Sequence, residues 1–218
     1  MMQATIVFGL PGAGKSALAR HLIHDLQAPP AAWFADDDRT LNFDATCLDL
    51  TRSDWAMRRM IWFRSGSCFV LNLDLCEQRI AELAAEGIEH IFVVCSGDPS
   101  LLYAKLAEVG SLQVNRAVLV LDAVRHLRDV REDRLDACAD WATLMTRADS
   151  IVLNKRDLVS REDMAYWLRF LQGRLGRGVD IIESKFGRVS AQRLTGIAQP
   201  HLANIARRSA TSPAAAGP

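Results

Sequence analysis

The chain has 218 residues, of which 50% are hydrophobic and 24% are charged, a composition that suits one globular domain with a sizeable core. Lys and Arg together number 26, as do Asp and Glu, and this balance argues against a nucleic acid or an anionic membrane as the partner. No apolar run approaches the ~20 residues that span a bilayer, and the five cysteines include no C-x-x-C pair. Without a secretory leader pattern at the amino terminus, we expect a cytoplasmic protein.

A glycine-rich motif follows the first predicted strand. The apolar run 4–8 leads directly into residues 9–16, GLPGAGKS, which fit the pattern G-x-x-x-x-G-K-[ST], and residues 17–26 then show helical spacing. Glycines let successive backbone N–H groups turn inward at phosphate oxygens, and the dipole of the following helix favours the same place. We therefore expect a nucleotide site in which Lys15 reaches the β- and γ-phosphates and the Ser16 hydroxyl ligates Mg²⁺.

An acidic cluster, residues 36–38, ends the next predicted strand, residues 31–35. Because loops that follow parallel strands face the nucleotide, one of these carboxylates could contact Mg²⁺; Asp37 is our candidate, with Asp44 as its rival. Residues 40–64 form an insertion where a nucleotide-sensing switch loop would lie, with a helix predicted over 54–64.

Strands and helices alternate through the middle of the chain. Apolar runs predict strands at 67–71, 90–95 and 117–122, the last ending in a carboxylate, and helical spacing predicts helices at 77–85, 100–109 and 123–147. Continuous apolar strands between helices indicate a parallel sheet that is covered on both faces. We predict an α/β fold of the P-loop NTPase type, three layers deep, with a mostly parallel central sheet.

A second motif, NKRD at residues 154–157, ends the predicted strand 150–154. The Asp157 carboxylate could accept two parallel hydrogen bonds from the N1–H and N2 amine of guanine, a pair that adenine does not offer. Asn154 could reach the base N7 or tie this loop to the phosphate loop, and the Lys155 stem could cover a face of the base. The motif therefore predicts a guanine nucleotide.

The last third of the chain completes the predicted domain. A capping-box pattern at 160–163 starts a helix, a strand follows at 179–183, Ser184 begins a third candidate base-contacting loop, and a helix is predicted over 189–206. Beyond it the sequence is rich in Ala, Ser, Thr, Pro and Gly. We expect a single GTP-binding domain over residues 1–207 and a disordered tail over 208–218.

The order of these motifs resembles the CobW, UreG and HypB class of GTPases, whose members deliver or insert metal ions such as nickel, cobalt or zinc. The matching stretches are residues 9–16, 96–99, 120–123, 148–157 and 186–189, and the CobW branch is the most similar. The resemblance implies that GTP or GDP binds with Mg²⁺, for which Ser16 and Asp37 are the ligands expected above. The expected nucleotide contacts are Gly9, Pro11, Gly12, Ala13, Gly14, Lys15, Ser16, Ala17, Gly97, Asn154, Lys155, Asp157 and Ser184.

Two departures from the family pattern affect the expected activity. The acidic residue that supports Mg²⁺ and the attacking water in the family falls on Val94, and the family's cysteine-rich metal motif retains only Cys68. We therefore expect slow GTP hydrolysis, with Lys15 as a catalytic residue and Asp98 or one of residues 36–38 replacing the missing acid.

Two other functions stay open. One is a regulatory switch or assembly factor that binds GTP, barely hydrolyses it and docks a protein partner; the other is an ATP-dependent small-molecule kinase, which the NKRD motif disfavours. A protein partner is expected for the first of these, and a homodimer stays open.

Overall fold

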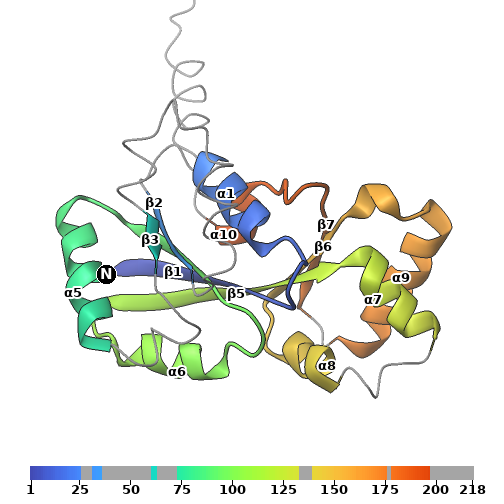
Figure 1. The fold of residues 1–218 in the computed structure, drawn as a ribbon, viewed down its shortest axis with the longest axis horizontal. Helices are drawn as coiled ribbons and strands as arrows, with labels where there is room; N and C mark the ends of the chain where they lie inside the picture. Colours follow the sequence, from blue (N-terminus) through green and yellow to red (C-terminus); the bar gives the residue numbers. More distant parts are fainter. Residues whose placement is uncertain (26–30, 36–59, 63–72, 133–138, 176–177, 197–218) are drawn as a thin grey trace, which may run out of the picture.

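The computed structural model describes residues 1–25, 31–35, 60–62, 73–132, 139–175 and 178–196 (Figure 1). Our predictions for Asp37, Asp44, Cys68, the strand at 67–71 and the tail at 208–218 lie outside the described residues. No described helix has the length and apolar character needed to cross a membrane.

A seven-stranded sheet forms the centre of the molecule, with strand order β3-β2-β4-β1-β5-β6-β7. The strands are β1 (Met2–Phe8), β2 (Ala31–Ala35), β3 (Met60–Trp62), β4 (His90–Val94), β5 (Leu112–Asp122), β6 (Ser150–Asn154) and β7 (Asp180–Glu183). Every pair of neighbours in this sheet is parallel. The prediction of a mostly parallel sheet is confirmed.

Helices cover both faces of the sheet (Figure 1). Among the described residues, the helices on one face are α1 (Lys15–Asp25) and α10 (Ala191–Thr195). Those on the other are α5 (Leu73–Ala85), α6 (Ser100–Glu108), α7 (Ala123–Arg131), α8 (Ala139–Thr146) and α9 (Arg161–Arg174). Strands β1, β4 and β6 are buried on both sides, so alternate residues enter different cores: Ile6 packs with the larger set of helices and Val7 with α1 and α10. The fold is the three-layer α/β fold that we predicted.

Several predicted elements differ from the observed ones; the helix predicted over 77–85, for example, begins at Leu73 as α5. Met60 and Ile61 lie on β3, so the helix predicted over 54–64 is wrong at its carboxyl end. β5 begins at Leu112 rather than 117, because polar residues in its first half hide the strand from an apolar pattern. The helix predicted over 123–147 is two helices, α7 and α8. The helix predicted over 189–206 ends at Gly196, whose φ of 74° caps α10.

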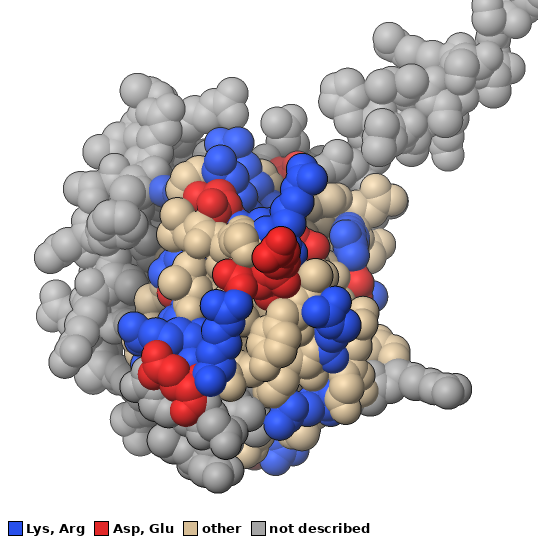
Figure 2. Space-filling model, turned by 90° about the vertical axis from the view of Figure 1, so that its right-hand side faces the viewer, with Lys and Arg blue, Asp and Glu red and all other residues tan. Residues whose placement is uncertain are grey.

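Charged side chains of both signs lie together on the end of the molecule that carries α7 and α9. Figure 2 shows acidic side chains near the centre of this face with basic side chains around them. Arg131 of α7 pairs with Asp163 of α9. The charged stretch of α7 therefore contributes to a mixed surface rather than to a patch of one sign.

Candidate nucleotide-binding site

The motifs of the sequence analysis meet at the carboxyl edge of the sheet. The phosphate loop follows β1, Gly97 follows β4, Asp122 ends β5, the NKRD motif begins at the end of β6, and Ser184 follows β7. Parallel strands bring their carboxyl ends to one edge, and this is where open α/β sheets bind ligands. The fold therefore assembles the predicted site from five separate loops.

The phosphate loop needs its first glycine for space as well as for conformation. Gly9 has a φ of 140°, and a Cβ atom there would lie 2.4 Å from the carbonyl oxygen of Val120 in β5. Gly12 and Gly14 also have positive φ angles, 81° and 99°. These conformations allow the loop to turn sharply between β1 and α1.

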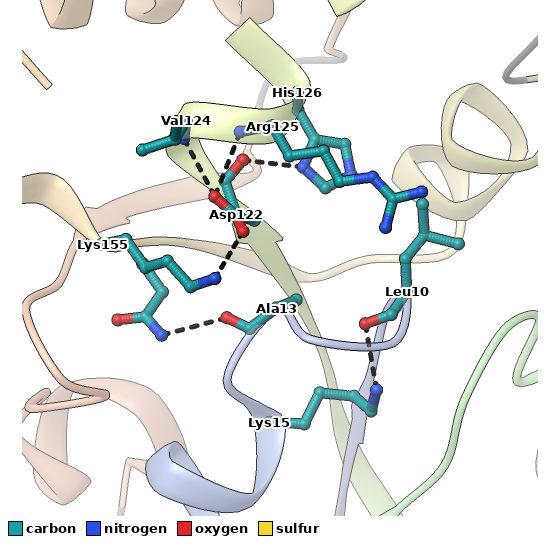
Figure 3. Close-up of polar contacts among 9 residues, drawn as sticks. Leu10, Ala13, Lys15, Asp122, Val124, Arg125, His126 and Lys155 are labelled. Carbon is teal, nitrogen blue, oxygen red and sulfur yellow. Dashed lines mark hydrogen bonds and ion pairs between the residues drawn. The ribbon is translucent and has the colours of Figure 1, made fainter. Parts of the chain in front are cut away.

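Lys15 lies back across the phosphate loop and is buried (Figure 3). Its Nζ donates to the carbonyl oxygens of Gly9 and Leu10, both at 3.1 Å. Ser16 follows in the first turn of α1 and is partly buried. The ammonium group is therefore held in the loop, beside the amino end of a helix, where an anion is favoured.

The loop after β4 contacts the phosphate loop through its glycine. The backbone N–H of Gly97 donates to the carbonyl oxygen of Gly9 at 3.3 Å. Before it, Val94 is buried at the end of β4, in register with Val7 of β1 and Ala35 of β2. The position that the family resemblance assigns to an acid is thus an apolar position at the edge of the site.

Asp98 lies two residues before helix α6 and binds its first residue. Its Oδ1 accepts hydrogen bonds from the hydroxyl of Ser100 at 2.6 Å and from the backbone N–H of Ser100 at 2.9 Å. These two bonds hold the pKa of Asp98 below its ordinary value, so the carboxyl is ionised at neutral pH. The side chain is exposed and has a structural role, and its catalytic role stays a prediction.

Asn154 joins the phosphate loop to the loop after β7. Its Nδ2 donates to the carbonyl oxygen of Ala13 at 3.0 Å, and its Oδ1 accepts from the backbone N–H of Gly187 at 3.0 Å. A Cβ atom on Gly14 would lie 2.1 Å from this Nδ2, so the absence of a side chain at Gly14 makes room for the contact. Of the two roles that the sequence left open for Asn154, the structure shows the tie between loops.

Lys155 and Asp157 have different surroundings. Lys155 adopts a left-handed conformation with a φ of 62°, and its Nζ donates to Oδ2 of Asp122 at 2.6 Å (Figure 3). Asp157 lies on the short helix η3 (Arg156–Leu158) and is exposed. Within the described part of the chain, the Asp157 carboxylate takes part in no hydrogen bond or ion pair. The residue that we expect to recognise the base is thus available to a ligand.

Ser184 supports the NKRD loop through its backbone. Its carbonyl oxygen accepts from the N–H of Arg156 at 3.0 Å, and its N–H donates to the carbonyl oxygen of Leu153 at 2.8 Å. Its hydroxyl donates to the carbonyl oxygen of Arg188 at 3.3 Å, and the residue is buried. A direct contact of Ser184 with the base stays a prediction.

Sequence reasoning found the carboxylate at the end of β5 but assigned Asp122 no role. Oδ1 of Asp122 accepts from the backbone N–H groups of Val124 and Arg125 at 3.0 and 3.1 Å, which caps α7. Burial alone would raise the pKa of Asp122, but the hydrogen bond and charge of Lys155, with these two amides, hold it below its ordinary value. The signal was present in the sequence, because a strand that ends in Asp before a helix is a common N-cap pattern.

Together, the fold and the loop define a P-loop nucleotide-binding protein. Residues 3–179 match the nucleotide-binding domain of the CobW/HypB/UreG family, and the chain belongs to this family. No curated protein matches the sequence. Of the residues that the structure describes, no three His, Cys, Asp or Glu side chains gather in a way that could hold a metal ion.

Solved structures of low sequence identity share the fold. A zinc-bound triple mutant of the E. coli GTPase YjiA is 17% identical, with a TM-score of 0.57, over 84% of this chain and 57% of that chain. HypB from Helicobacter pylori in complex with nickel is 15% identical, with a TM-score of 0.56, over 99% of this chain and 92% of that chain. The signal recognition particle receptor FtsY from Elizabethkingia anophelis is 12% identical, with a TM-score of 0.54, over 89% of this chain and 61% of that chain. This chain thus spans little more than half the length of YjiA.

Proposed function

We propose that this protein binds GTP and GDP and selects guanine through Asp157. The observation that carries the proposal is the contrast within the NKRD motif. The side chains of Asn154 and Lys155 are held by the protein, whereas the carboxylate of Asp157 is exposed and makes no hydrogen bond or ion pair within the described residues. A carboxylate on a braced loop matches the paired N1–H and N2 donors of guanine.

The phosphates and Mg²⁺ would bind at the phosphate loop. Lys15, the loop amides and the amino end of α1 supply positive potential there, and Gly97 lies beside the loop. The Ser16 hydroxyl suits Mg²⁺, because this ion takes one or two protein oxygens and completes its shell with phosphates and water. Bound Mg²⁺ would neutralise charge on the phosphates, and Asp37 is the proposed second protein ligand.

We further propose slow hydrolysis of GTP to GDP and phosphate, in a single domain over residues 1–207 followed by the tail 208–218. Lys15 would stabilise charge that develops on the transferred phosphoryl group, with Asp98 or one of residues 36–38 assisting the water. The structures of YjiA and HypB contain zinc and nickel, which supports a link between this protein and metal handling. We also propose that the protein is cytoplasmic and acts with a protein partner.

A second candidate function is a GTP-dependent switch or assembly factor with impaired hydrolysis. The buried Val94 favours it, because an apolar side chain at this strand end can neither activate water nor hold Mg²⁺. Limited proteolysis of residues 36–65 separates the candidates. Protection by GTP and not by GDP would support the switch, and equal protection by both would contradict it.

The Asp157→Asn variant tests the guanine assignment. An amide at this position donates one hydrogen bond and accepts one, so it fits the N1–H and C2 carbonyl of xanthine instead of the two donors of guanine. We expect the variant to bind GDP about 100-fold more weakly and to prefer xanthosine diphosphate, as measured by calorimetry or fluorescence competition.

Asp180→Asn is the matched control, since it makes the same substitution at a half-buried position in β7 outside the site, where the carboxylate pairs with Arg193. It should bind GDP as the unmodified protein does. ATP binding as tight as GTP binding, or a GDP affinity that Asp157→Asn leaves unchanged, would remove the guanine assignment.

A further inference from the structure

Asp122 divides its two carboxylate oxygens between two loops of the site (Figure 3). Oδ1 accepts from the backbone amides at the start of α7, and Oδ2 accepts from Lys155 Nζ at 2.6 Å. The side chain of Asp122 is 12% exposed and that of Lys155 is 37% exposed. The ion pair is thus partly shielded from water, where a charge pair contributes more than at an open surface.

Strand pairing places this contact at the edge of the base site. Asp122 ends β5 in register with Asn154, the last residue of β6, and Lys155 follows it immediately. The two contacts of Asn154 fix the backbone on one side of Lys155, and η3 with Asp157 begins on the other. The neighbouring residues therefore hold the backbone of Lys155. Its long side chain is held by a separate contact, the ion pair with Asp122.

A lysine side chain has four rotatable carbon–carbon bonds, and fixing it costs rotamer entropy. A carboxylate that pairs with the ammonium group restrains this stem before a ligand binds. The binding of the nucleotide then does not include the entropy cost of ordering the side chain. The stem then lies at a fixed place in the same loop as the exposed Asp157, which follows Lys155 by two residues. A restrained stem of this kind can form a wall of the base site.

We propose that Asp122 is a positioning residue for base recognition: it anchors Lys155 so that the lysine stem is held in place beside Asp157. This inference rests on the proposed binding of guanine nucleotides. In this role Asp122 acts through Lys155 rather than on the nucleotide itself, while its other oxygen caps α7.

The two tasks of Asp122 can be separated by substitution. Asn caps helices about as well as Asp, so Asp122→Asn keeps an oxygen for the amides of Val124 and Arg125 but loses the charge that holds Lys155. Asp122→Ala loses both functions. Lys155→Met keeps the apolar stem and removes the ammonium group.

The experiment is a double-mutant cycle on the dissociation constant of GDP, with thermal unfolding of every variant. We expect Asp122→Asn to weaken GDP binding about 5- to 20-fold, at an almost unchanged melting temperature and an unchanged preference for GDP over ADP. In the Lys155→Met background the same substitution should change GDP affinity less than twofold. Asp122→Ala should lower the melting temperature as well, because α7 loses its cap.

Two results would overturn the inference. If Asp122→Asn binds GDP as tightly as the unmodified protein, the anchor does not contribute to base binding. If it weakens binding by the same factor with and without the Lys155 ammonium, Asp122 acts by another route. A failure of the unmodified protein to bind GDP would instead overturn the proposed function, and this inference with it.

Discussion

Val94 is the residue that bears most directly on catalysis. Its side chain is buried at the end of β4 in an apolar cluster with Val7 and Leu18. A group that orients water or ligates Mg²⁺ must be polar, so this position supplies no catalytic group. The nearby Asp98 carboxylate is ionised but is held by Ser100 at the start of α6.

We therefore predict slow turnover of GTP by the isolated protein, about 10⁻⁴ to 10⁻² per second, the range between a GTPase without a catalytic arginine and one that carries this arginine in its own chain. Release of phosphate in single-turnover reactions measures it. Lys15→Ala is the control, since loss of the residual rate shows that it belongs to this protein. Turnover on the order of tens per second would mean that a group other than residue 94 replaces the acid.

At the residue scale, the sequence predicted which residues form the site but not how their side chains pair. The spacing of residues 9–16 and 154–157 was enough to predict Lys15, Asn154 and Asp157 as functional. The contacts of Asn154 with Ala13 and Gly187 join residues that are 141 and 33 positions apart, and only the folded topology brings them together. The pairing of Asp122 with Lys155 depends on the register of β5 and β6, which the sequence does not determine.

At the scale of elements, the loop after β7 packs directly on α1. A Cβ atom on Gly187 would lie 2.5 Å from the backbone nitrogen of Leu18 in α1, and the N–H of Gly187 donates to Asn154. Gly196 at the end of α10 has nearly the same φ, 74° against 71°, but a Cβ atom there would meet nothing within 4 Å among the described residues. Both glycines therefore have a backbone conformation that strains other residues, but only Gly187 also lacks room for a side chain.

This pair gives a matched prediction. Gly196→Ala should lower the free energy of unfolding by about 1 kcal/mol, the cost of a left-handed conformation for alanine. Gly187→Ala should lower it by about 2–4 kcal/mol, because the new methyl group meets the backbone of α1. Urea unfolding measures both. Equal effects would show that the loop can move away from α1 at little cost.

Elements with long apolar runs could be predicted from the sequence, and those whose place depends on partners could not. The runs at 90–95 and 150–154 became β4 and β6 almost unchanged. The first half of β5 mixes polar and apolar residues, and its strand geometry comes from pairing with β1 across a register shift between Ala4 and Thr5. Met60 and Ile61 belong to β3 because β2 pairs with them, which local periodicity cannot reveal.

On the scale of the whole molecule, a polar connection crosses three strands within the buried sheet. His90 of β4 is fully buried, its Nε2 lies 3.0 Å from the Thr5 hydroxyl of β1, and this hydroxyl donates to Asn115 of β5 at 3.2 Å. The His90 ring also packs on Phe92, with ring centroids 4.8 Å apart. Burial lowers the pKa of His90 to about 4, so the folded protein holds this imidazole in its neutral form at neutral pH.

The pKa of His90 predicts how stability depends on pH. The unfolded chain protonates this side chain near pH 6.5 and the folded chain only near pH 4, so between these values the unfolded state binds more protons. The contribution of His90 is therefore fully present above pH 6.5 and is lost as the pH falls toward 4, by about 3 kcal/mol in total. His126 adds to the loss in the same direction, because burial also lowers its pKa, whereas the lowered carboxyl pKa values of Asp98 and Asp122 act at more acidic pH.

Replacing His90 with glutamine isolates its share, since the amide has no charge to gain. Urea unfolding of His90→Gln at intervals from pH 7 to pH 4 should show a lower stability at pH 7 and a clearly smaller decline than the unmodified protein over the same interval. The remaining decline belongs to His126 and other groups. Parallel pH curves for the two proteins would mean that His90 takes up its proton within the folded sheet, which requires that β4 and β1 open at this point without unfolding the molecule.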